Sequence, residues 1–439
     1  MGLALSLEQA GVPTVAVHTH VFARLVKSTV TTHGMPTARN VFVPQPVVGR
    51  SPAELRAYVE GIDPISKRPF IQEVIDGLSQ PLNDNDLKGM SFDRSNPRLL
   101  PPDTEDNLQA LFIENKWTDF LPVLLPIEER VAAMLKGTSH PPDKIVGRLR
   151  ATAFREEWEF NVEKVAVNAV MAGAKPEYLP VILALAASGM SARSSSTTSW
   201  ACISVVNGPI RNEIGMNSGI GALGPYAQAN ATIGRAHNLL SINLQGGSVP
   251  GDTYMGSVGN PLNYSTCFAE NEERSPWAPL HVQKGFKPTD SVVSVFLAGW
   301  YMHAGFGPRE TWREKMIRSM QGAEHYSPPL WVMDPIVARG FVDLGYDTKE
   351  KLIAWMAASA KLPAREYWDN QWVQTLLHPH AVAGVEPYAS KLKAAPDEMV
   401  EIFQDKDINI IVAGGETQGA WKMFSGNYRN GTVSIDAWR

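Results

Sequence analysis

The chain has 439 residues, a formal net charge of −5, 44% hydrophobic residues and 19% charged residues. These values are typical of a globular protein and exclude a largely disordered chain. Nucleic-acid-binding proteins usually carry a basic face, so the acidic balance favours a small-molecule or protein partner instead. The length predicts at least two domains.

Other features of the sequence bear on where the protein works. No apolar run approaches the roughly 20 residues that cross a bilayer, and no secretory signal is recognisable at the start of the sequence. The chain contains two cysteines, Cys202 and Cys267, whereas secreted proteins usually contain more. We therefore expect a cytoplasmic oligomer that binds neither membranes nor nucleic acid.

The first 82 residues alternate between helical and strand patterns. Within them, Ser51, Pro52 and Glu54 predict the start of a helix with Ser51 as its N-cap. The order predicts a doubly wound unit with parallel strands. A parallel layer usually opens with a strand, so we expect this unit to be incomplete, with its first strand supplied elsewhere or lost by shortening. The predicted elements are a helix at 3–10, a strand at 12–18, a helix at 21–32 and a strand at 41–43.

Residues 83–107 predict a linker, because they are rich in Asn, Asp and Pro and have few apolar anchors. A larger α/β domain is expected over residues 108–439, so the predicted fold class is α/β: a small incomplete doubly wound parallel unit followed by a larger α/β domain. No repeat of 20–50 residues is visible. Its predicted helices are 120–136, 153–171, 176–190, 229–240 and most of 312–372, and its predicted strands are 291–297 and 408–413.

The segment 203–235 is dense in Gly, Asn and Ser. Glycines let backbone N–H groups approach an anion, and Asn, Ser and Arg add directional hydrogen bonds around it. The segment therefore predicts a binding loop for a carboxylate or phosphate, with Arg211 and Arg235 as anchors; the alternative is an irregular structural connection. The candidate substrate-binding residues of this loop are Asn207, Gly208, Arg211, Asn217, Ser218, Asn230 and Arg235.

A second segment places Cys267 near several acids and a histidine. This composition could form a nucleophile with its base or a metal site, although its spacing matches no zinc pattern. Neighbouring acids raise the pKa of a thiol, so a small buried hydrophobe is the favoured role of Cys267, and core packing that of Cys202. The candidate catalytic residues are Glu270, Glu272, His281 and Cys267.

Two weaker candidates remain. His18 and His20 share one side of a predicted strand end and could bind one metal, or they could be ordinary polar residues there. The turn after strand 408–413 could contact an anion or serve tight packing, and it lacks the dinucleotide-binding pattern of glycines. Its candidate residues are Gly414, Gly415 and Glu416.

Several strings of this sequence resemble one family, the UGSC-type (seleno)proteins, grouped with the selenoprotein B components of glycine, sarcosine, betaine and D-proline reductases. The family motif is selenocysteine or cysteine followed by Gly, Ser and Cys; it would lie upstream of Leu3, and this chain has no cysteine before Cys202. The resemblance therefore implies a reactive thiol or selenol supplied by a small partner chain or lost with a shortened start. The strings are LEQAGVPTV (7–15), PQPVVGRS (44–51), EKVAVNAVMAG (163–173), NGPIR (207–211), FAENE (268–272) and AGGE (413–416).

Three functions are open at this point. The first is a thiol- or selenol-dependent enzyme, an oxidoreductase or lyase subunit that cleaves or forms a C–S or C–N bond on a small carboxylated or heteroatom-bearing substrate. The second is a metal- or carboxylate-dependent lyase or hydrolase that uses His18, His20 and Glu270. The third is a non-catalytic binding subunit. No cofactor is required by the sequence, and a metal is possible in the second case.

Overall fold

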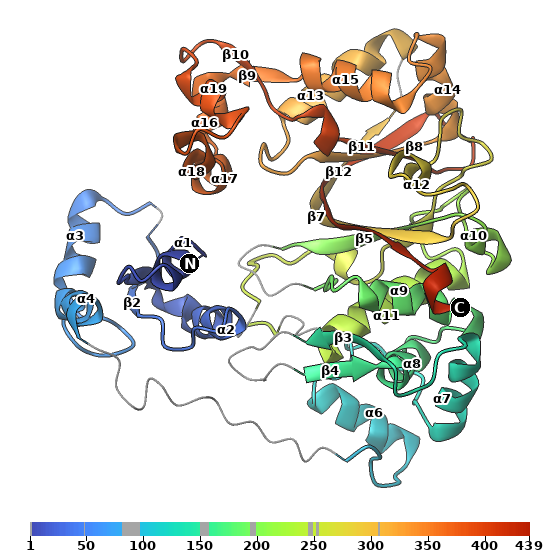
Figure 1. Ribbon diagram of the computed structural model, residues 1–439, viewed down its shortest axis with the longest axis horizontal. Helices are drawn as coiled ribbons and strands as arrows, with labels where there is room; N and C mark the ends of the chain where they lie inside the picture. Colours follow the sequence, from blue (N-terminus) through green and yellow to red (C-terminus); the bar gives the residue numbers. More distant parts are fainter. Residues whose placement is uncertain are drawn as a thin grey trace.

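The computed structural model describes residues 2–47, 49–80, 97–149, 158–193, 199–244, 249–251, 254–305 and 308–439. Over these residues the protein is α/β, as predicted, with a small parallel sheet near the N-terminus and a six-stranded mixed sheet in the larger part (Figure 1). Within the same residues, no helix has both the length and the apolar character needed to cross a membrane.

The N-terminal segment confirms the predicted alternation of helices and strands. Strands β1 and β2 pair in parallel, with His18 opposite Phe42. The predicted capping box is present, since the Glu54 N–H donates to Ser51 Oγ and the Ser51 N–H donates to Glu54 Oε2. The elements are α1 (Gly2–Gln9), β1 (Ala16–Thr19), α2 (Ala23–Thr32), β2 (Asn40–Val43), α3 (Pro52–Glu60) and α4 (Phe70–Ser79).

This segment has its own small core, in which Phe70 of α4 packs against Val41 and Val43 of β2. Residues 81–96, which include much of the predicted linker, lie outside the described residues. Helix α6 (Glu105–Glu114) begins inside the predicted linker, because the Thr104 hydroxyl caps it by accepting from the Asn107 N–H. The domain boundaries therefore stay predictions.

The larger sheet, within the described residues, has the strand order β11-β8-β12-β7-β5-β6. It consists of two halves with the same topology: β5 is parallel to β6 and antiparallel to β7, and β8 is parallel to β11 and antiparallel to β12. Strands β7 and β12 pair antiparallel and join the halves. The bounds are β5 (Ala201–Asn207), β6 (Cys267–Ala269), β7 (Val292–Gly305), β8 (Pro329–Met333), β11 (Asn409–Val412) and β12 (Ala420–Ser434).

In each half, one face of the sheet packs against helices of that half. In the first half these helices are α8 (Val162–Met171), α9 (Leu179–Ala187) and α11 (Gln228–Asn243). In the second half these are α13 (Trp312–Gln321), α14 (Pro335–Asp343) and α15 (Lys349–Ser359). The opposite faces of all six strands share a third core. The sheet edges β6 and β11 meet, since the Asn271 N–H donates to Val412 O at 2.7 Å. The third core includes Ile203, Phe268, Phe296, Leu330, Ile411 and Phe424.

The prediction for residues 120–136 is wrong in part, because Pro122 and Pro126 disfavour a helix and α7 (Glu128–Met134) begins only after them. Of the helix predicted over 153–171, residues 153–157 lie outside the described residues, and among the rest only Val162–Met171 are helical. Strand β4 (Trp158–Asn161) pairs with β3 (Ile145–Leu149), and the Asn161 side chain then caps α8. Strand β8 interrupts the predicted helical region 312–372. The predictions confirmed by α9, α11, β7 and β11 are those over 176–190, 229–240, 291–297 and 408–413.

The remaining elements are short. They are α10 (Ile210–Glu213), α12 (Leu280–Gln283), β9 (Lys361–Pro363), α16 (Ala364–Asp369), α17 (Gln371–Leu376), α18 (His378–Val382), α19 (Tyr388–Lys393) and β10 (Met399–Glu401). Helices α10 and α12 follow β5 and β6 in the chain, and the others form a group beside the second half (Figure 1).

Because the N-terminal segment has its own core, we expect it to unfold separately from the larger part of the chain. Phe70→Ala should cost about 3–5 kcal/mol of stability in this segment alone, because a buried aromatic ring is replaced by a cavity. Hydrogen exchange should therefore accelerate in β1, β2 and α4 and stay unchanged in β5 and β7. An equal acceleration in both groups of strands would show that the two parts unfold as one unit.

Candidate functional site

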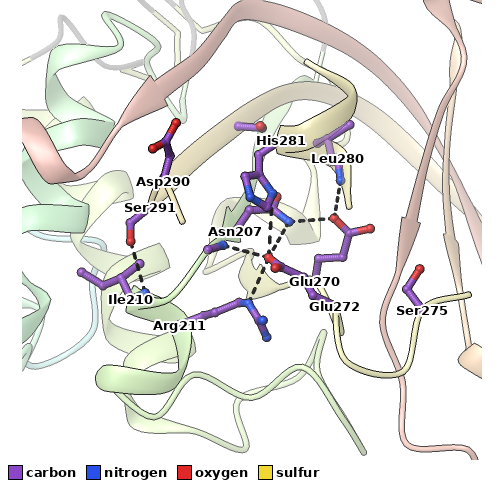
Figure 2. Close-up of polar contacts among 12 residues, drawn as sticks. Asn207, Ile210, Arg211, Glu270, Glu272, Ser275, Leu280, His281, Asp290 and Ser291 are labelled. Atoms are coloured by element: carbon purple, nitrogen blue, oxygen red, sulfur yellow. Dashed lines mark hydrogen bonds and ion pairs between the residues drawn. The ribbon is translucent and has the colours of Figure 1, made fainter. Parts of the chain in front are cut away.

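The predicted catalytic residues lie at one edge of the larger sheet. Strands β5 and β6 are parallel neighbours, and their carboxyl ends lead to Asn207 and Glu270. Ligands of α/β proteins commonly bind at this end of parallel strands. Figure 2 shows Asn207, Glu272 and His281 converging there, with His281 on the short helix α12.

Glu270 is fully buried and its carboxylate is saturated. Oε2 accepts from Asn207 Nδ2 and from the Leu280 N–H, each at 2.7 Å. Oε1 accepts from Lys349 Nζ at 2.8 Å and from the Val412 N–H at 3.3 Å. These donors leave no carboxylate oxygen free for proton transfer or a metal. Glu270 therefore holds the structure together, which differs from its predicted acid–base role.

Glu272 is held less completely. Its Oε1 accepts from the Gly208 N–H at 2.8 Å and from Asn207 Nδ2 at 3.0 Å, and Arg211 Nε lies 3.0 Å away. The Glu272 side chain keeps 14% of its surface exposed. Gly208 is required for this contact, because its φ is +87° and a Cβ would clash with the Asp290 carbonyl oxygen. Glu272 is thus a fixed carboxylate that solvent still reaches.

His281 is the most unusual residue of the site. It is fully buried, and among the described residues neither ring nitrogen has a hydrogen-bond partner. Its Nδ1 lies 3.9 Å from Glu272 Oε1, and Asn207 Oδ1 is buried beside them without a partner (Figure 2). Buried polar atoms without partners are rare and mark places where water or a reacting group is accommodated. The arrangement is suited to proton transfer.

The predicted anion anchor Arg211 is already neutralised. Its Nη1 and Nη2 donate to the two carboxylate oxygens of Glu273 at 2.9 and 2.7 Å, and only 4% of the residue is exposed. This bidentate pair is the main reason that the pKa of Glu273 falls to about 2. The prediction that Arg211 anchors a ligand is therefore not supported, and its guanidinium instead positions Glu272 and Glu273.

The Asn-rich loop is tied mainly to itself. The Asn217 N–H donates to Asn230 Oδ1, and Asn230 Nδ2 donates back to the Asn217 carbonyl oxygen, both at 2.9 Å. The Ser218 carbonyl accepts from the Gly414 N–H at 2.9 Å. Asn217 and Asn230 thus brace the loop, and Ser218 connects it to the turn after β11.

That turn is built by close packing. A Cβ on Gly414, whose φ is +141°, would clash with the Asp334 carboxylate, and one on Gly415 would clash with Ile220. The Glu416 N–H donates to Asp334 Oδ2 at 2.9 Å. The glycines therefore serve close packing of the turn against the loop, which is the second of the two roles considered for them.

Ion pairs recur at the same place in both halves of the sheet. Glu273 follows β6 and pairs with Arg211 of α10, and Glu416 follows β11 and pairs with Arg339 of α14. Arg274 links the halves, since its Nη2 lies 2.7 Å from Glu416 Oε2. Arg274 and Arg339 are exposed, and no local sequence pattern distinguishes them from other surface arginines.

Arg235, the second predicted anchor, points elsewhere. Its Nε and Nη2 each lie 2.9 Å from one carboxylate oxygen of Asp119, and Nη2 also donates to the Pro122 carbonyl oxygen at 2.8 Å. The guanidinium fastens α11 to the segment before α7. These contacts give Arg235 a structural role and do not support the anchor prediction.

Both cysteines are buried. Cys267 lies on the face of β6 that packs against the helices of the first half, and Cys202 lies on the same face of β5. Burial raises the pKa of each thiol to about 12. The reactive thiolate is therefore scarce at neutral pH, so the packing role is supported over the predicted catalytic role of Cys267.

The predicted metal ligands lie in the N-terminal segment. His18 Nε2 and His20 Nδ1 are buried without a hydrogen-bond partner within the described residues, and burial lowers the pKa of His18. No group of three or more His, Cys, Asp or Glu side chains in the described part of the chain is placed to hold a metal ion. The pair thus lacks a third protein ligand there.

The N-terminal segment is also where similarity to known proteins is found. Residues 2–68 match the model of the UGSC family. This UGSC-like segment contains β1, β2 and the histidines at the end of β1. No curated protein matches the chain.

The buried pair of Glu270 and Lys349 yields a stability prediction. Lys349→Met should cost about 3–5 kcal/mol, because it leaves a buried carboxylate without its counter-charge. Combining it with Glu270→Gln should recover part of that loss in chemical denaturation. The control is Lys351→Met, which breaks an exposed pair with Asp347 and should cost less than about 1 kcal/mol. Similar losses for the two lysine variants would contradict the role of Lys349.

Glu273 should make the stability of the folded protein depend on pH in the acidic range. Its pKa is lowered from 4.5 to about 2 in the folded protein. The folded state therefore binds this proton less readily, so the stabilisation is present above about pH 4.5 and is lost as the pH falls toward 2. Glu273→Gln should lower the melting temperature at neutral pH, and the difference from wild type should shrink below about pH 4.5. A difference that does not vary with pH would reject this origin.

Proposed function

We propose that this chain is an enzyme subunit that uses Glu272 and His281 for acid–base chemistry on a small polar substrate. The observation that carries the proposal is the fully buried imidazole of His281, whose Nδ1 lies 3.9 Å from the Glu272 carboxylate. A carboxylate next to an imidazole orients the ring and stabilises its protonated form, which suits a general base.

Each neighbour has a role in this arrangement. The Gly208 N–H, Asn207 Nδ2 and the Arg211 guanidinium surround Glu272 Oε1. They hold the carboxylate in place with Oε1 at 3.9 Å from His281 Nδ1, so that Glu272 orients the imidazole ring. Nε2 of His281 is then the atom that takes or returns a proton.

The reaction class that we infer is a thiol- or selenol-dependent cleavage or formation of a C–S or C–N bond, on a carboxylated or heteroatom-bearing substrate. The similarity of residues 2–68 to the UGSC family supports this inference. Cys202 and Cys267 are buried with raised pKa values. We therefore infer that the reactive sulfur or selenium is neither of these two cysteines, and that a small Cys- or Sec-containing partner chain is one source of it.

The alternatives differ in their support. A metal-dependent enzyme using His18, His20 and Glu270 is disfavoured, since both Glu270 oxygens are engaged by protein donors. The second candidate is a non-catalytic binding subunit. The ion pairs of Arg211 and Arg339 support it, because they connect the segments around the site and need no reaction to explain them. The experiment below separates this role from catalysis.

Glu272→Gln and His281→Phe should each lower kcat by about 10²- to 10⁴-fold, because each removes one member of the acid–base pair. Product formation is measured with small carboxylated thioethers and amines, in the presence of dithiothreitol or a Cys/Sec partner protein. The control is Glu213→Gln, which changes an exposed acid on α10 that pairs with Arg439. Circular dichroism verifies that each variant is folded.

Two outcomes would overturn the proposal. Full turnover by both folded variants would place the chemistry elsewhere in the chain. A ligand that binds tightly to the wild type but is never converted, with either reductant, would make the chain a binding subunit instead.

A further inference from the structure

A separate cavity lies in the second half, away from Glu272. It has a volume of about 230 Å³ and lies where α16 and α19 meet β12 and the 3-10 turn η6 (Asp405–Asp407). Pockets for drug-sized ligands measure about 300–1,000 Å³, so this one suits a smaller molecule. Its lining includes Tyr367, Tyr388, Lys391, Gln404, Asp407 and Tyr428.

Lys391 is the central group of this cavity. Only 7% of the residue is exposed, and its Nζ lies 4.5 Å from the ring centroid of Tyr367 and 5.9 Å from that of Tyr388. Among the described residues it has no acidic partner within ion-pair distance. The contrast with Lys349 is direct, because that buried lysine contacts the Glu270 carboxylate at 2.8 Å. Buried lysines without an acidic partner are unusual and are often functional.

Two further polar groups of the cavity have no partner in the described part of the chain. They are the hydroxyl of the fully buried Tyr367 and Nδ1 of His325. The His325 ring stacks on Tyr367, with centroids 6.3 Å apart and planes 10° apart. The Lys391 amine lies over the ring of Tyr367 and both residues line the cavity, so a ligand with one polar oxygen could contact the amine and satisfy the hydroxyl.

The charges around Lys391 favour an amine nucleophile over an anion receptor. Burial lowers the pKa of Lys391 to about 8, so part of the population is neutral near neutral pH. The acids nearby are Asp407 of η6 and Glu401 of β10, which attract the ammonium from a distance and would repel an anionic ligand. Burial also raises the pKa of Tyr367, which keeps its hydroxyl protonated.

We propose that Lys391 is a nucleophilic amine that captures a small, uncharged aldehyde or ketone as a Schiff base in this cavity. The neutral amine attacks the carbonyl carbon, and the carbinolamine that forms then loses its hydroxyl group as water and leaves the imine. The Tyr367 hydroxyl donates a hydrogen bond to the carbonyl oxygen during the attack. No oxidant or reductant is consumed, and the aromatic rings form the walls against which the ligand packs.

The test is reductive trapping on the wild-type protein. The folded chain is incubated with benzaldehyde and, separately, acetaldehyde in the presence of cyanoborohydride, and adducts are mapped by peptide mass spectrometry. Lys391 should be modified at least about tenfold faster than Lys393, which is exposed on the same helix, because its amine is neutral more often. A rate at Lys391 equal to or below that of Lys393 would overturn the proposal.

Variants test the role of the hydroxyl. Tyr367→Phe should slow trapping at Lys391 by at least about tenfold and leave Lys393 unchanged, because it removes only the hydrogen-bond donor. Lys391→Arg should abolish the adduct at this position. An unchanged rate at Lys391 in a folded Tyr367→Phe protein would refute the assigned part of Tyr367.

Discussion

The buried carboxylate of Glu270 connects four segments of the larger part of the molecule. Its oxygens accept from the end of β5, the start of α12, the start of α15 and the backbone of β11, through Asn207, Leu280, Lys349 and Val412. Burying a carboxylate and an ammonium is costly, and it is tolerated where hydrogen bonds satisfy the remaining lone pairs, as they do here. The Glu270 carboxylate thereby fixes both edges of the sheet relative to one another.

The candidate centre depends on the same group. Asn207 Nδ2 donates to Glu270 at 2.7 Å and to Glu272 at 3.0 Å, so one amide connects the structural carboxylate to the proposed acid–base pair. Leu280, whose N–H also donates to Glu270, directly precedes His281. The separation of Glu272 from His281 is therefore set by how Glu270 is bound. Rigid support of this kind is what general acid–base catalysis requires of its surroundings.

The sequence was a good guide to local structure and to the neighbourhood of the site. The capping box at Ser51 and the helix–strand alternation follow from short-range patterns, and the acids after β6 do meet Asn207 and Gly208. The roles of the individual site residues are harder to predict, because the residues that they bind are distant in the sequence. Lys349 lies 79 residues from Glu270, and Asp119 lies 116 residues from Arg235. No local pattern predicts such pairs, so a structural arginine and a structural glutamate both resembled site residues.

A difference between the two halves of the sheet accounts for the candidate centre being in one half only. The N–H of Glu270 donates to the carbonyl of Val206, and the N–H of Ala413 donates to that of Met333, so Ala413 occupies in the second half the position that Glu270 holds in the first. Alanine cannot bind the ends of four segments, and the second half instead lends its β11 backbone to the Glu270 carboxylate. Both halves have an arginine–glutamate ion pair after the edge strand, Arg211 with Glu273 and Arg339 with Glu416. They differ at the buried position that Glu270 occupies in the first half. One half therefore carries the carboxylates and the imidazole, while the glycine turn of the other packs against its loop.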